Sequence, residues 1–208
     1  MKRITNKDIK EMSHVYRLNL INSINGYKAA NLIGTKGVNG ENLAIISSVI
    51  HLGSNPPLLG FIMRPTTVGR DTYRNIIENG SYTINHVHTK IVEKAHYTSA
   101  NLEFGVSEFE KCKLTPQYKN DFIAPYVEES NIQVGMSLVE EIPIPSNGTI
   151  LMVGKIEEIH IHDSIIAENG QIDLNAADTA AISGLNRYHK VEQVAQFPYA
   201  RPEEIPNF

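Results

Sequence analysis

The chain has 208 residues, of which 41% are hydrophobic and 20% charged, and this is the composition of an ordinary globular domain with a sizeable core. Its net charge of −4 gives no electrostatic case for nucleic acid or an anionic membrane as a partner. The single cysteine, Cys112, excludes an intrachain disulfide. The polar N-terminus does not predict a signal peptide, and the lack of a long apolar run does not predict a membrane span. The expected location is therefore the cytoplasm.

Before residue 50 the pattern indicates helix followed by a β-hairpin. Residues 1–14 are charged and are expected to form an arm or a short helix, and a helical spacing of apolar residues follows over 18–24. Residues 28–34 and 43–50 are apolar and β-branched, which is typical of strands. The glycines and asparagines between them predict a turn over 35–42.

The next stretch carries the most informative pattern. Glycine, serine, asparagine and two prolines break the strand over 53–57. The continuously apolar run over 58–63 is typical of a strand buried on both faces, and a polar loop follows over 64–72. A short helix is expected over 73–79, where a glycine stops it, and a third strand over 81–86.

The polar loop has the composition of an anion-binding site. Guanidinium groups are planar, permanently charged donors that suit phosphate, and a helix N-terminus adds free N–H donors. Asp71 would repel a phosphate, so we expect it to be the N-cap, turned toward the helix backbone. A capped helix with solvated arginines is the alternative. The residues that would form a seat for a phosphate monoester are Arg64, Thr66, Thr67, Arg70 and Thr72.

Beyond the third strand the character of the chain changes. Residues 87–131 combine short helical segments with irregular polar sequence, and we expect an insertion over the mouth of a barrel. Strands are predicted over 132–139 and 149–161, and the apolar parity of the second slips near 157–158, which predicts a β-bulge. Prolines keep the tail over 185–208 extended.

Two other chemistries receive little support from the sequence. The pairs His86 with His88 and His160 with His162 each place two side chains on one face of a strand. Neither pair has the third ligand or the carboxylate pattern of a catalytic zinc site, so no metal is predicted. No G-x-S-x-G turn is present for a serine hydrolase, and Cys112 is expected to be a packing residue rather than a nucleophile.

The order of short motifs resembles a known family. The segments NLA, SS, SNPP, LLGF, RPTT, RDTYRNI and GSYTINHV follow one another over residues 25–90, and weaker matches, ISGLNRYHK and FPYARP, lie near the C-terminus. This resembles the flavin reductase-like family of FMN-binding split barrels. The resemblance implies a mainly β, antiparallel split barrel with a few short peripheral helices, formed by residues 1–208 as one domain, and usually a homodimer.

The resemblance also assigns roles to individual residues. Ser47, Ser48 and Val49 would border the isoalloxazine ring and the ribityl chain of FMN, and Asn75 would bond near the phosphate or lock the loop. Tyr188 would border the flavin or the nicotinamide, although the usual two-glycine version of its segment is absent, which leaves nicotinamide use open.

The implied activity is hydride transfer from NADH or NADPH to FMN. No side-chain acid or base is assigned, because the flavin carries the chemistry and the protein supplies position and electrostatics. Two alternatives stay open: an FMN electron carrier that does not oxidise NAD(P)H itself, and a barrel that binds a different phosphate ligand.

Overall fold

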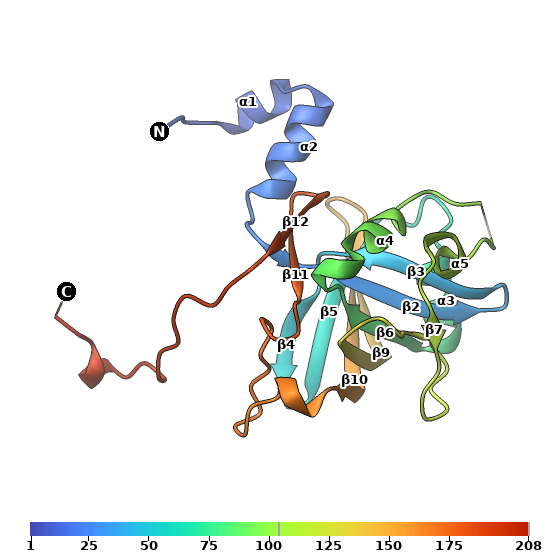
Figure 1. The fold of residues 1–208 in the computed structure, drawn as a ribbon. Coiled ribbons are helices and arrows are strands. Elements are labelled where there is room, and N and C mark those ends of the chain that lie inside the picture. The colour runs from blue at the N-terminus through green and yellow to red at the C-terminus, as the bar shows by residue number, and fades with distance from the viewer. Residues whose placement is uncertain (104, 208) are drawn as a thin grey trace.

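The computed structural model describes residues 1–103 and 105–207, and Figure 1 shows their arrangement. Within these residues most of the regular structure is strand. A seven-stranded antiparallel sheet has the order β3-β2-β6-β9-β10-β5-β4, a smaller sheet has the order β1-β11-β12, and β7 pairs with β8. The strands are β1 (Lys28–Ala29), β2 (Asn31–Gly37), β3 (Gly40–Ile46), β4 (Ile50–Ser54), β5 (Pro57–Met63), β6 (Ser81–His86), β7 (Pro116–Gln117), β8 (Tyr126–Val127), β9 (Ile132–Ile144), β10 (Thr149–Ile161), β11 (Ala180–Ser183) and β12 (Arg187–Lys190).

The helices are short and lie around the sheets. Three of them, α3, α4 and α5, pack on the large sheet, whereas α1 and α2 project away from it (Figure 1). The α-helices are α1 (Asn6–Glu11), α2 (His14–Ser23), α3 (Asp71–Asn79), α4 (Val92–Tyr97) and α5 (Glu108–Cys112). The 3-10 turns are η1 (Thr89–Ile91), η2 (Asp163–Ile165) and η3 (Pro202–Glu204).

The large sheet encloses one apolar core and is therefore a barrel. Side chains from β2, β5, β6, β9 and β10 meet in a single cluster, and Ile46 at the end of the edge strand β3 packs against it. A second cluster lies on the outer face of β2 and β3, under α4, α5 and β11. Burial of these two apolar surfaces is the main driving force for this fold. The mainly β, antiparallel architecture predicted from the sequence is confirmed.

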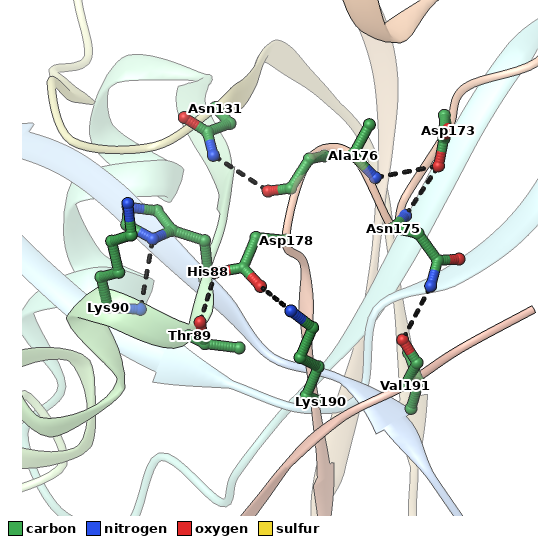
Figure 2. A network of polar contacts seen from close by, with 11 residues as sticks. His88, Thr89, Lys90, Asn131, Asp173, Asn175, Ala176, Asp178, Lys190 and Val191 are labelled. Carbon is green, nitrogen blue, oxygen red and sulfur yellow. Dashed lines mark hydrogen bonds and ion pairs between the residues drawn. The ribbon is translucent and has the colours of Figure 1, made fainter.

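A network of polar contacts fixes the segment that follows the barrel (Figure 2). Asn131 donates to the backbone carbonyl of Ala177 at 2.9 Å, and Thr89 donates to the carboxylate of Asp178. Asn175 donates to the carbonyl of Val191 at 2.9 Å. Residues 192–207 are exposed throughout, and Gln196 Nε2 donates to Gln171 Oε1 at 3.3 Å.

Several strand predictions are confirmed. The strands expected over 58–63, 81–86 and 149–161 are β5, β6 and β10. The predicted bulge is present, because the pairing of β10 with β9 shifts register between Ile156 and Glu158. Among the described residues no group of three or more His, Cys, Asp or Glu side chains is arranged to hold a metal ion.

Other predicted strand and turn boundaries were wrong, for reasons that the structure shows. The strand expected over 43–50 ends at Ile46, and residues 47–49 connect two strands. The strand expected over 28–34 is interrupted at Ala30, where the chain passes from the small sheet into the large one. The turn expected over 35–42 is much tighter, because cross-strand pairing continues to Gly37 and Gly40, and Gly40 supplies the positive φ of 103° that the reversal requires.

The break expected over 53–57 is also shorter, since β4 continues to Ser54 and β5 begins at Pro57. The insertion contains a small hairpin, β7 with β8, beside the expected helices. In the described part of the chain, none of the helices has the length and apolar character needed to cross a membrane.

Candidate functional site

The loop between β5 and α3 is closed on itself. It begins at Arg64, directly after β5, and Arg70 Nε donates to the carbonyl oxygen of Pro65 at 2.9 Å. The turn between β9 and β10 lies against the same loop, since a Cβ added at Gly148 would be 3.7 Å from the Pro65 ring. The cross-link and the adjacent turn hold the loop in one shape above the end of β5.

The loop concentrates positive charge. Burial lowers the pKa of Arg70, and the nearby positive charge of Arg64 lowers it further. Among the described residues neither guanidinium takes part in an ion pair. Two like charges held close together without a counter-charge favour binding of an anion.

The N-terminus of α3 opens onto this loop. The N-cap is Arg70, with extended backbone angles of φ −133° and ψ 111°, and no side chain caps the helix. The helix therefore presents backbone N–H donors and the positive end of its dipole beside the guanidinium groups. The prediction that Asp71 is the N-cap was wrong, because Asp71 already lies in the first turn and forms an ion pair with Arg74.

The threonines of the motif separate into two groups. Thr66 and Thr67 are exposed on the loop. Thr72 is buried, and its hydroxyl donates to Asn42 Oδ1 at 2.8 Å. Asn75 is buried as well, and its Nδ2 donates to Thr35 Oγ1 at 3.1 Å. The structure thus leaves Thr66 and Thr67 exposed on the loop that carries the guanidinium groups and turns Thr72 and Asn75 toward the barrel.

The buried pair belongs to a network that continues to α5. Asn42 Nδ2 donates to Glu108 Oε2 at 2.7 Å, and the backbone N–H of Leu43 donates to the same oxygen at 3.0 Å. Burial raises the pKa of Glu108, and the two donors oppose that shift. The network fastens α3 and α5 to the β2–β3 hairpin and so supports the helix that carries the loop.

Ser47, Ser48 and Val49 lie near the start of the loop. They connect β3 to β4 and lie outside both strand ladders, so their backbone groups are not committed to the sheet. Ser48 Oγ accepts a hydrogen bond of 3.0 Å from the backbone N–H of Ile62, two residues before Arg64. This bond holds the 47–49 segment at the end of β5, next to the charged loop.

Tyr188 lies elsewhere in the described contacts. It is part of β12, it packs against the second apolar cluster, and its hydroxyl is 3.1 Å from His96 Nδ1. Burial raises the pKa of Tyr188 to about 12. Its contact with a flavin or a nicotinamide stays a prediction.

Sequence reasoning missed the residues that support the site. Asn42 and Glu108 are 66 positions apart, and no local pattern connects them. Tyr73 donates to Glu141 Oε2 at 2.8 Å and ties α3 to β9, across 68 positions. This bond is the first cause of the raised pKa of Tyr73, and burial adds to it.

The chain is thus an antiparallel barrel protein with a charged loop at the N-terminus of a helix. Residues 28–175 match the flavin reductase like domain, and the chain therefore belongs to the flavin reductase-like family. A candidate flavin reductase with a split-barrel domain from Shewanella frigidimarina is 45% identical, with a TM-score of 0.93 over 96% of this chain and 100% of that one.

Two other solved structures share the fold. Nitrilotriacetate monooxygenase component B from Bacillus cereus is 24% identical, with a TM-score of 0.83 over 95% of this chain and 98% of that chain. Flavoredoxin of Desulfovibrio vulgaris is 22% identical, with a TM-score of 0.73 over 84% of this chain and 92% of that chain. The split-barrel fold is thus common to this chain and these structures.

Proposed function

We propose that this chain is a cytoplasmic flavoprotein that binds FMN and catalyses NAD(P)H-dependent reduction of flavin. The observation that carries the proposal is the pair Arg64 and Arg70, two guanidinium groups without a counter-charge among the described residues, beside an uncapped helix. This arrangement suits a dianionic phosphate monoester, which is the charged end of FMN and is absent from riboflavin. Membership of the flavin reductase-like family supports a flavin as the ligand.

The donor set of the loop fits the phosphate of FMN. Arg64 and Arg70 would supply charge-assisted hydrogen bonds, and the exposed hydroxyls of Thr66 and Thr67 would complete the coordination. Thr72 and Asn75 would hold the loop from behind through their contacts inside the barrel. The ion pair of Asp71 with Arg74 turns that carboxylate toward a cation, which reduces its repulsion of a phosphate.

The ring system would lie along the connection between β3 and β4. The backbone groups of Ser47, Ser48 and Val49 are outside the strand ladders and are free to bond the polar edge of an isoalloxazine ring. The bond from Ile62 to Ser48 fixes the distance from this segment to the charged loop. When bound, FMN would supply the acceptor for a hydride, and the residues named here bind and orient it.

We further propose a homodimer with flavin sites at its interface. A flavin ring needs most of its surface covered to bind tightly, and the connection between β3 and β4 lies at the edge of the barrel. A second copy of the chain would cover the ring, and twofold assemblies are the commonest soluble oligomers.

An electron carrier without NAD(P)H oxidation is the second candidate. It is favoured by Tyr188, whose side chain is packed in the second cluster and bonded to His96, and by the missing glycine pair of that segment. In this case reduced partner proteins, and not nicotinamide nucleotides, would deliver the electrons.

Absorption spectroscopy and anaerobic stopped flow separate the candidates. The purified protein should retain flavin absorption bands. Anaerobic mixing with NADH or NADPH in the stopped-flow instrument should bleach these bands. A flavin that binds but that neither nucleotide reduces would establish the carrier. A protein that retains no FMN after equilibration and gel filtration would point to another phosphate ligand.

A further inference from the structure

The helix α2 presents a face that the described chain covers only in part, since Arg17, Leu18 and Asn22 are half-buried. Neither α1 nor α2 contains a buried residue, and Ile21 is 45% exposed. Spacing of i, i+3, i+4, i+7 and i+8 places five side chains on one face of a helix. They line a hollow of about 290 Å³ and are His14, Arg17, Leu18, Ile21 and Asn22.

The C-terminal tail is the second uncovered segment. Residues 192–207 are exposed throughout, and the aromatic side chains of Phe197 and Tyr199 are 83% and 87% exposed. The tail is extended apart from the 3-10 turn η3, which begins at Pro202. Figure 1 shows that the tail leaves β12 and runs away from α2, so it does not fill the hollow of its own chain.

The two segments have opposite charge. Residues 1–27 contain five Lys and Arg against two Asp and Glu. Residues 191–208 contain one Arg against three Glu. A basic helical arm and an acidic extended tail are electrostatically complementary, which favours their association and sets its orientation.

We propose that the tail of one copy lies in the α2 hollow of a second copy, and the reverse, so that two chains clasp each other. Phe197 and Tyr199 would pack on Leu18 and Ile21, and Glu203 and Glu204 would approach Arg17. This rests on the dimer in the proposed function and adds to its flavin interface a second contact, between the arms, that holds the two chains together. A second copy supplies both halves in equal number and closes the assembly by twofold symmetry.

Light scattering on the full chain tests the clasp. The native protein should have twice the chain mass of 23.2 kDa at micromolar concentration. Ile21→Asp and, separately, the pair Phe197→Ser with Tyr199→Ser should shift it to the mass of one chain. Val38→Asp is the control, because Val38 is 82% exposed at the β2–β3 turn, away from both arms, and it should stay dimeric. A native monomer, or arm variants that remain dimers, would overturn the clasp.

Cross-linking establishes whether the contact is between chains. In a Cys112→Ser background, a chain with Ile21→Cys is mixed with a chain with Tyr199→Cys, refolded together and oxidised with diamide. The clasp predicts a disulfide between the two kinds of chain, whereas its absence from the mixture contradicts it. Bound FMN is measured in every sample. Loss of FMN binding in an intact dimer counts against the flavin assignment alone, and a flavin-free clasped dimer leaves the arm contact standing.

Discussion

Two polar regions adjoin α3, one at the loop before its N-terminus and one facing the barrel, and they differ in how their polar groups are satisfied. On the solvent side, Arg64 and Arg70 have no ion-pair partner among the described residues. On the barrel side, Thr72 and Asn75 bond neighbours inside the protein, in a network that reaches Glu108. One short motif thus contains a part available to a ligand and a part committed to the fold.

The difference follows from the cost of burying polar groups. A buried donor or acceptor without a partner costs about 1–3 kcal/mol, so the barrel side is stable only when the protein itself satisfies it. The exposed Arg64 and the half-buried Arg70 carry less of this cost, but two guanidinium groups held together repel each other until an anion binds. Residue type alone does not separate the two roles, whereas burial does.

The largest expected effect comes from removing the charged groups of the loop, Arg64 and Arg70. Removing both Arg64 and Arg70 by substitution with Ala should weaken FMN binding by more than a hundredfold, since each charge-assisted bond contributes about 1.5–3 kcal/mol. Fluorescence titration with FMN measures the affinity, and thermal unfolding of the flavin-free protein should change little. Lys90→Ala, an exposed cation on η1, is the matched control and should bind normally. Unchanged affinity in the double variant would exclude the loop from the site.

Acid should destabilise the fold through His86 on β6, a buried polar group without a partner among the described residues. The Nδ1 atom of His86 is buried without a hydrogen bond in the described structure, and burial lowers the pKa of His86 to about 4. Because its folded pKa lies below the unfolded value near 6.5, stability is complete above about pH 6.5 and falls as pH drops toward 4, by about 3 kcal/mol. Urea unfolding at pH 7 and pH 4.5 should show a smaller loss in His86→Gln than in the native chain. Equal losses in both proteins would show that another group is responsible.

The barrel side is tested by Thr72→Val, which keeps the shape and removes the hydroxyl. The variant should lose about 1–3 kcal/mol of unfolding free energy, because Asn42 Oδ1 loses a buried donor. Its FMN affinity should fall much less than that of the Arg70→Ala protein. The opposite ranking, a stable fold with an affinity as low as that of Arg70→Ala, would mean that Thr72 bonds the phosphate directly.

The smallest effect concerns Glu108, whose contribution to stability changes with pH in the opposite direction to that of His86. Burial raises the pKa of Glu108, so the folded state binds its proton more tightly than the unfolded chain does, and stability falls as pH rises from the unfolded pKa through the folded one. Glu108→Gln, which can still accept from Leu43, should flatten this part of the stability profile. Urea unfolding between pH 4 and pH 7 measures it, and a profile as steep as that of the native chain would contradict the assignment.

Local patterns were sufficient for most of the barrel. Apolar runs and their bounding glycines and prolines predicted β5, β6 and α3, and the change of parity in β10 predicted its bulge. These features depend on neighbouring residues and on burial of one or both faces of a strand. The sequence did not predict the early end of β3, because Ser47 to Val49 have a composition typical of strands. The strand ends at Ile46 because its pairing with β2 ends there, opposite Asn31.

The candidate site was only partly accessible to sequence reasoning. The charged loop could be predicted because Arg64 through Arg70 are contiguous and chemically distinctive. The inward orientation of Thr72 and Asn75 could not, since it depends on partners at Asn42 and Thr35, on strands that no local rule connects to α3. Which residues of the motif contact a ligand is therefore a question of tertiary structure.

The most direct test of the phosphate anchor compares FMN with riboflavin. The two ligands share the ring and the ribityl chain and differ in the phosphate, so their affinity ratio isolates the contribution of the Arg64–Arg70 loop. In the native protein FMN should bind at least a hundredfold more tightly than riboflavin, and in the Arg64→Ala, Arg70→Ala double variant the ratio should approach one. Equal affinities in the native protein, or a preference for FMN that survives the double substitution, would contradict the account.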